Sequence, residues 1–194
     1  ICVIVLLYLI RRYVKGGVCT EKDVTGKVII VTGSSAGIGK AQAFNLLENG
    51  ATVIFACRDE KKTRLVLEET KNLVNKSKAI TSCFDRAVYI NVNLNSFKSV
   101  SNFVSIFKKK FDHLDILVNN AGYIATDFVI TEDGLEASIQ TNHYSHVLLT
   151  MLLLDYFNKT DGRIINVASL AHQFSNYETT LKTSFNKETG DQYK

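Results

Sequence analysis

The chain has 194 residues, of which 46% are hydrophobic and 22% are charged, and this composition is typical of a globular protein. Its net charge of +4 is too small and too scattered to indicate a nucleic-acid partner. The four cysteines and four histidines show no spacing typical of metal ligands. We therefore predict reduced thiols and no metal site.

The first ten residues, ICVIVLLYLI, are apolar and are followed by Arg11, Arg12 and Lys15. Ten residues are too few to cross a bilayer, which takes about 20. Because residue 1 is Ile and the chain stops at GDQYK without a closing element, we expect a fragment cut at both ends. Residues 1–15 are then the end of a membrane anchor with a basic flank. A buried strand and a signal-peptide core are the alternatives, the latter weaker because no small-residue cleavage site follows.

From residue 28 onward, apolar runs alternate with helical patterns. Strands are predicted over 28–32, 52–57, 87–92, 115–118 and 163–167, and helices over 37–49, 59–76, 96–111 and 131–157. This rhythm indicates βαβ units. The predicted fold class is α/β, a Rossmann-like doubly wound parallel sheet truncated after the fifth strand, in one domain over 16–194 that is incomplete at its C-terminus.

A glycine-rich loop, VTGSSAGIG over 31–39, follows the first strand and opens the first helix. Gly33 permits a tight turn, Gly37 lets the backbone approach a pyrophosphate, and Gly39 lets helix and strand pack closely. The pyrophosphate would meet free N–H groups at the positive end of the helix dipole. Because the loop lacks the Lys-Ser/Thr pair of a nucleoside triphosphate loop, we predict a dinucleotide site.

The end of the second strand selects between dinucleotides. An acidic residue there binds the adenosine ribose hydroxyls, whereas an arginine suits the 2′-phosphate of NADP. The chain has Arg58 first and Asp59 second. NADP is therefore the predicted cofactor, with NAD as the alternative. A solvated charge at a helix start is the competing interpretation of Arg58.

Four motifs in order resemble the short-chain dehydrogenase/reductase family: TGSSAGIG, VNNAG (118–122), TNHYSHVLLT (141–150) and GRIINVASLAH (162–172). The stretches GGVCTEKDVTGKVIIVTG and ACRD narrow the likeness to its retinol dehydrogenase-like branch. The resemblance extends from about residue 16 to residue 172. It implies an NADP-dependent oxidoreductase that interconverts an alcohol and an aldehyde or ketone, on an apolar or retinoid-like substrate.

The resemblance also implies residue roles. Along the pyrophosphate and its neighbouring ribose it places Gly33, Ser35, Gly37, Ile38 and Gly39. Asn93 would lie beside the adenine, where the family commonly has Asp, and Asn119, Ala121 and Gly122 would flank the adenosine side. Asn142 would hold a water of a proton relay, and Ser169 would hydrogen-bond the substrate carbonyl oxygen. The alternatives are an amide that bonds helix backbone for Asn142 and a helix N-cap for Ser169.

The family's acid/base is a Tyr followed four residues later by a Lys, on one helix face. There the cation lowers the phenol pKa from about 10. No Tyr in the chain has Lys at this spacing, since Lys182 comes five residues after Tyr177. We expect the Tyr-x-x-x-Lys pair beyond Lys194, so the chain as printed is predicted to be inactive. The alternative function is a degenerate cofactor-binding or protein-interaction module without turnover.

The N-terminal basic cluster predicts the membrane topology, because such clusters tend to stay cytoplasmic. We predict association with the endoplasmic reticulum membrane, with the domain facing the cytosol. Asn75-Lys76-Ser77 and Asn158-Lys159-Thr160 match the N-glycosylation pattern and would be modified in a luminal domain. Glycosidase treatment of microsomal protein should leave its gel mobility unchanged, and protease added outside intact microsomes should remove the domain. Glycans on Asn75 or Asn158 would contradict this topology but not the cofactor.

Overall fold

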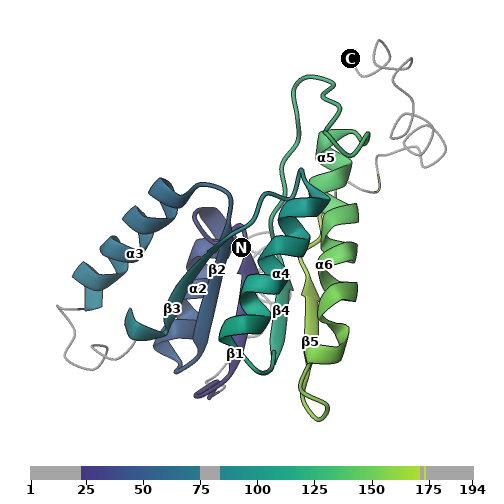
Figure 1. Ribbon diagram of the computed structural model, residues 1–194. Coiled ribbons are helices and arrows are strands. Elements are labelled where there is room, and N and C mark those ends of the chain that lie inside the picture. The colour runs from purple at the N-terminus through teal and green to yellow at the C-terminus, as the bar shows by residue number, and fades with distance from the viewer. Residues whose placement is uncertain (1–22, 75–83, 171–172, 174–194) are drawn as a thin grey trace, which may run out of the picture.

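Five parallel strands form a single sheet in the order β3-β2-β1-β4-β5. The computed structural model describes residues 23–74, 84–170 and 173 (Figure 1). The strands are β1 (Val28–Thr32), β2 (Thr52–Cys57), β3 (Ala87–Asn91), β4 (Ile116–Asn119) and β5 (Arg163–Asn166). Strand order reverses between β1 and β4, which makes this the topological switch point of a doubly wound sheet. The predicted α/β fold with a parallel sheet is confirmed.

Helices connect consecutive strands, as Figure 1 shows. They are α2 (Gly37–Glu48), α3 (Glu60–Val74), α4 (Phe97–Lys110) and α6 (Ser145–Leu153). Helix α2 ends where the sequence predicted, because Gly50 adopts a φ of 96° and donates its N–H to the Leu47 carbonyl at 3.2 Å. Helix α4 begins at the N-cap Ser96, whose hydroxyl accepts from the Ser99 N–H.

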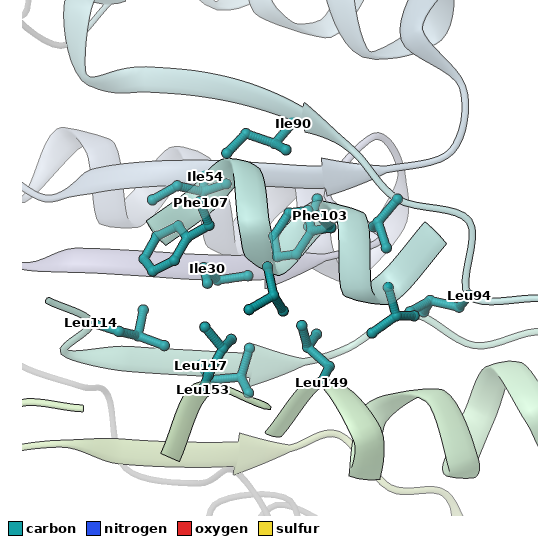
Figure 2. Packing of buried hydrophobic residues seen from close by; sticks show 14 of the residues in the cluster. Ile30, Ile54, Ile90, Leu94, Phe103, Phe107, Leu114, Leu117, Leu149 and Leu153 are labelled. Carbon is teal, nitrogen blue, oxygen red and sulfur yellow. The ribbon is translucent and has the colours of Figure 1, made fainter. Parts of the chain in front are cut away.

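The strands carry apolar side chains on both faces of the sheet, which gives two cores. One core lies between the sheet and helices α4 and α6 (Figure 2). Its largest side chains are Ile30, Ile54, Leu117, Phe103, Phe107, Leu149 and Leu153. The second core lies against α2 and α3 and contains Ile29, Val31, Phe55, Leu47 and Val66. Each large side chain buried in this way contributes about 1.5–3 kcal/mol to folding.

The predicted helix over 131–157 is wrong in its extent and its regularity. Residues 131–136 form a turn in which Gly134 has a φ of 79° and donates its N–H to the Thr131 carbonyl. Helix α5 (Ala137–Ile139) then begins, because the Glu136 carboxylate caps it by accepting from the Ser138 and Ile139 N–H groups. A π-helical turn over Gln140–Tyr144 leads into α6, and a 3₁₀ turn over Leu154–Tyr156 ends the element.

Several sequence predictions fall outside the described residues. These are the anchor over 1–15, the glycosylation pattern at Asn75 and the stretch after residue 173. Within the described ranges, no helix combines the length and the apolar character that a bilayer crossing requires. The same ranges contain no cluster of three or more His, Cys, Asp or Glu side chains arranged for a metal.

The buried carboxylate of Asp115 joins the amino ends of the strands. It accepts from the Val28 N–H at 2.8 Å, from Lys27 Nζ at 3.2 Å and from Asn158 Nδ2 at 3.1 Å. Burial alone would raise the pKa of Asp115, but the hydrogen bonds from Val28, Lys27 and Asn158 outweigh it and lower this pKa below its usual value. The ionised form therefore stabilises the fold.

Replacing this carboxylate should destabilise the protein. Asp115→Ala leaves buried donors unpaired, and we expect a loss of about 2–4 kcal/mol in unfolding free energy at pH 7. Because the folded pKa is lowered, the contribution is complete above about pH 4, the unfolded value, and disappears as pH falls through the folded pKa. Asp161→Ala removes the other, exposed partner of Lys27 and should cost at most about 1 kcal/mol. Equal losses in urea unfolding of the two variants would contradict the role of Asp115.

Candidate active site

The glycine loop packs tightly against the segment that follows β4. Gly33 has a φ of 67°, and a Cβ added there would lie 2.9 Å from the Cα of Ala121. A Cβ on Gly39 would lie 2.4 Å from Asn120 Nδ2 and 2.7 Å from the Gly33 carbonyl oxygen. These approaches require glycine, because backbone atoms cannot move aside cheaply. The loop therefore brings the N-terminus of α2 to the carboxyl end of β4.

The N-terminus of α2 has the features of an anion site. Its N-cap is Ala36, which makes no side-chain capping hydrogen bond, and the first turn carries no acidic residue. The first N–H groups of a helix lack helical partners and lie at the positive end of its dipole. A Cβ at Gly37 would meet no described atom within 4 Å, so the space in front of the helix is open. This geometry suits a phosphate group.

A cleft of about 620 Å³ runs along the glycine loop and the ends of β2, β3 and β4. We call it the glycine-loop cleft. Of the ten residues predicted to bind the cofactor, all but Asn119 line it: Gly33, Ser35, Gly37, Ile38, Gly39, Arg58, Asn93, Ala121 and Gly122. These residues come from four separate stretches of sequence, and the parallel sheet brings them to one edge. Their cofactor roles remain predictions.

Asn119 is directed away from the glycine-loop cleft. Its side chain is buried and donates Nδ2 to Thr150 Oγ1 at 3.2 Å and to Asn166 Oδ1 at 2.8 Å. The side chain thereby braces β4 against α6 and β5. It lines a second cleft, described below, and not the glycine-loop cleft, and its cofactor role stays a prediction.

Asn93 lies in the glycine-loop cleft with its amide oxygen partly used. That oxygen accepts from the Asn95 N–H at 3.1 Å. The Asn93 N–H in turn donates to Ser99 Oγ at 2.9 Å at the start of α4. A side-chain amide oxygen has two lone pairs, so one is left for an adenine amine.

The second cleft, of about 970 Å³, lies between β5, α6 and the segment after β4. We call it the Asn142–Ser169 cleft, because it brings together the two residues predicted to be catalytic. Four consecutive residues, 120–123, line both clefts. The two clefts therefore meet at the end of β4, beside the switch point of the sheet.

Asn142 lies in the π-helical turn, and its side chain is exposed. Its Oδ1 accepts from the Tyr123 N–H at 3.0 Å and its Nδ2 donates to the Tyr123 carbonyl at 2.8 Å. The pair of bonds fixes the segment after β4 onto the helix. One N–H and one lone pair of the amide remain for a further partner. The proton-relay role of Asn142 is a prediction that these contacts leave open.

Polar side chains anchor the turn that carries Asn142. Thr141 Oγ1 donates to Asn95 Oδ1, and Ser145 Oγ donates to the Leu94 carbonyl. Gln140 Nε2 donates to Asp133 Oδ2 at 2.6 Å, and the same oxygen accepts from the Phe97 N–H at the start of α4. The π-helical turn is thus held by the loops around it, as is common where such turns occur at functional sites.

Ser169 follows β5 and is exposed on the wall of the Asn142–Ser169 cleft. Strand β5 reaches this position because it pairs in parallel with β4, with Asn166 opposite Asn119. The Val167 N–H then donates to the Asn119 carbonyl at 3.0 Å. Ser169 therefore projects from the carboxyl edge of the sheet, at the same end as the glycine loop.

Sequence reasoning missed Lys62, which lines the glycine-loop cleft together with Arg58. Asp59 caps α3, since its Oδ1 accepts from the Lys62 N–H at 2.9 Å. Because α3 starts at Glu60, Lys62 lies in its first turn, four residues after Arg58. An Asp at the N-cap position was the available signal.

Comparison with known proteins agrees with this geometry. The family model for short chain dehydrogenases matches residues 27–181. Human retinol dehydrogenase 11 is 39% identical over 173 residues, which cover 86% of this chain and 52% of that protein. Human retinol dehydrogenase 13 is 37% identical over 166 residues, covering 84% and 48% respectively. This chain spans about half the length of these curated relatives.

A solved structure with a similar fold is the active-site complex of Pseudomonas aeruginosa RhlG with NADP. It is 27% identical, has a TM-score of 0.61, and the match covers 77% of this chain and 55% of that one. The sheet order, the family model and the relatives agree. The chain belongs to the short chain dehydrogenase family, in its retinol dehydrogenase-like branch.

Proposed function

We propose that the whole protein is an NADP-dependent oxidoreductase that interconverts an alcohol and an aldehyde or ketone. The observation that carries this proposal is the junction of the two clefts. One cleft contains the uncapped helix N-terminus, the other contains Asn142 and Ser169, and residues 120–123 line both. A cofactor and a substrate bound in the two clefts would meet at the end of β4.

The residues of the glycine-loop cleft fit a dinucleotide. The open space before Gly37 and the free N–H groups of α2 suit its pyrophosphate. Ser35 and Ile38 lie on the same loop, and Ala121 and Gly122 form the opposite wall. When bound, the nicotinamide supplies or accepts the hydride.

The charges at the end of β2 support NADP over NAD. Arg58 and Lys62 are both exposed in the cleft, and no acidic side chain in the described residues pairs with either. Asp59, which would serve the ribose hydroxyls of NAD, uses one carboxylate oxygen to cap α3. Asp59 also lines the cleft, so the local balance is two cations against one partly engaged carboxylate, which favours a 2′-phosphate.

In the Asn142–Ser169 cleft, Ser169 would donate its hydroxyl hydrogen to the carbonyl oxygen and orient the carbonyl carbon. Asn142 keeps one amide N–H for a water molecule after its two bonds to Tyr123. These two residues position and polarise the substrate. Proton transfer at the substrate oxygen is assigned to a Tyr-x-x-x-Lys pair, which the printed residues do not contain.

The cleft walls favour an apolar substrate. Ile124, Val147, Met151 and Val167 line the Asn142–Ser169 cleft and expose between 39% and 85% of their surface. Contact with apolar carbon atoms would remove this surface from water. Together with the names of the retinol dehydrogenase relatives, this supports a small apolar or retinoid-like alcohol or aldehyde. The N-terminal apolar run supports association with a membrane, and apolar substrates concentrate in membranes.

The second candidate is a cofactor-binding module without turnover. The glycine-loop cleft would serve this function by itself, because it contains nine of the ten predicted cofactor residues without Asn142 or Ser169. Steady-state assays of the whole protein with NADPH and retinal separate the candidates. Oxidation of NADPH coupled to retinol formation supports the enzyme. NADPH binding without turnover of any tested aldehyde or ketone supports the module.

The cofactor preference depends on Arg58. In the whole protein NADPH should bind more tightly than NADH, and Arg58→Asp should lower the preference by about 10–100-fold, because one charge-assisted contact is lost and a repulsion is added. Fluorescence titration with each cofactor measures the two dissociation constants. Arg64→Asp is the matched control, since Arg64 is exposed, pairs with Glu60 and does not line the cleft. Equal affinities of the unmutated protein for NADPH and NADH would contradict the assignment.

The hydroxyl of Ser169 should act on the reaction and not on cofactor binding. Ser169→Ala in the whole protein should keep its affinity for NADPH while kcat falls by about 10²–10³, the usual cost of one donor to a developing oxyanion. Ser105→Ala is the control, because Ser105 is exposed on α4, donates its hydroxyl to the Ser101 carbonyl and lines neither cleft. A kcat unchanged in Ser169→Ala would leave Ser169 with the role of a helix cap.

A further inference from the structure

His146 is a buried histidine on a helix that otherwise consists mainly of apolar residues. It is the second residue of α6, and only 6% of its surface is exposed. Neither the cofactor nor the substrate role proposed above uses it. Its two ring nitrogens nevertheless both contact polar atoms, Nε2 at 2.9 Å from Thr32 Oγ1 and Nδ1 at 3.3 Å from the Asn142 carbonyl oxygen.

The hydroxyl of Thr32, at the end of β1, determines which nitrogen carries the proton. It accepts from the Asn120 and Ala121 N–H groups, both at 2.9 Å. A hydroxyl oxygen has two lone pairs, so both are occupied. Nε2 therefore cannot donate to this oxygen, and it accepts the Thr32 hydrogen instead. The alternative acceptor, the Val118 carbonyl, lies further away at 3.3 Å.

With Nε2 as an acceptor, a neutral ring carries its proton on Nδ1. That proton points to the Asn142 carbonyl, which can only accept. Burial lowers the pKa of His146, the bond to the Asn142 carbonyl raises it, and the neighbouring His143 lowers it again, so the net shift is downward. The neutral ring that the hydrogen bonds require is thus also the form that burial favours.

The bonds form a continuous chain. It runs from the backbone at residues 120 and 121, which lines both clefts, through the Thr32 hydroxyl and the His146 ring to the Asn142 carbonyl. The Asn142 side chain is bound separately to the Tyr123 backbone. Asn142 is therefore held at both its backbone carbonyl and its side-chain amide. The contact between the carbonyl and His146 is the one that ties it to β1.

We propose that His146 is a positioning residue. In its neutral Nδ1–H form it ties the π-helical turn, which contains Asn142, to the end of β1. This tie aligns the Asn142–Ser169 cleft with the glycine-loop cleft. Its effect on turnover rests on the proposed function. The tie between α6 and β1 does not, and the two can be measured separately.

Three substitutions of His146 in the whole protein distinguish a hydrogen-bonded tie from packing. In His146→Asn the amide nitrogen takes the place of Nδ1, and in His146→Gln the amide reaches the place of Nε2, so each keeps one end of the tie. His146→Leu keeps apolar volume and loses both ends. If His146 only filled space, Leu would be the best replacement. If His146 acts as a hydrogen-bonded tie, the Asn and Gln variants should retain more of the wild-type protection and turnover than the Leu variant.

Hydrogen exchange of the Tyr123 amide reports on the tie without any turnover. This N–H is bonded to Asn142 Oδ1, and its exchange should accelerate about tenfold or more in His146→Leu, and less in the Asn and Gln variants. His113→Leu is the matched control, because His113 lies at the opposite, amino ends of the strands, where it contacts Asp112 and Asp115. Nitrogen-15 histidine spectra of the unmutated protein should show His146 as the Nδ1–H tautomer.

Turnover provides the second measurement. In His146→Leu, kcat should fall about tenfold or more while the NADPH dissociation constant stays within about twofold, since Thr32 can still accept from residues 120 and 121. An Nε2–H tautomer, or Tyr123 exchange that is unchanged in His146→Leu, would overturn the proposal. The unmutated protein could also show no turnover while Tyr123 exchange accelerates in His146→Leu as expected. That outcome would refute the proposed function and leave the tie between α6 and β1 intact. An unchanged kcat in His146→Leu of an active protein would overturn the alignment role.

Discussion

The structure depends on the close approach of two backbone segments at the switch point of the sheet. The glycine loop and the segment after β4 pack so closely that side chains at Gly33 or Gly39 would collide with Ala121 or Asn120. Thr32, between β1 and the loop, binds the N–H groups of both of these residues. One wall of each cleft is formed by this contact. A shift of a few tenths of an ångström there would move the glycine-loop cleft and the Asn142–Ser169 cleft relative to one another.

The close approach of the glycine loop and the segment after β4 also explains why the helical region 137–153 contains buried polar residues. An amphipathic helix that only covered a sheet would have no use for Gln140, Thr141, Ser145 and His146 on buried positions, since each unpaired polar group would cost free energy. Three of them instead bond to loops at the carboxyl edge of the sheet, and His146 bonds to Thr32 at the end of β1. Helix α6 therefore combines two functions: its apolar residues bury the core, and its first turns are oriented by hydrogen bonds. The π-helical turn lies at the boundary between these two parts.

The strands could be predicted from sequence because short, apolar runs such as 28–32 and 52–57 are buried on both faces of a parallel sheet. The same topology brings the distant residues that were predicted to bind a cofactor to one cleft. The start of the helix after β4 could not be placed, because a Glu at position 136 is an ordinary helix residue until its carboxylate turns back to cap α5. The direction of the Asn119 side chain could not be predicted for a similar reason. Its motif fixes its backbone, whereas its side chain responds to Thr150 and Asn166, which come from later in the chain.

The proposed cofactor preference illustrates how a local structural role can bear on a functional one. From sequence, Arg58 and Asp59 were competing candidates, because they are adjacent and imply opposite cofactors. The capping requirement of α3 separates them. A helix that starts at Glu60 leaves its first N–H groups unpaired, and Asp59 meets this need with a 2.9 Å bond. Arg58, Asp59 and Lys62 all line the glycine-loop cleft, but one carboxylate oxygen of Asp59 is bound to the start of the helix, whereas both cations have their charged groups available. The helix cap therefore supports the proposed preference for a 2′-phosphate over free ribose hydroxyls.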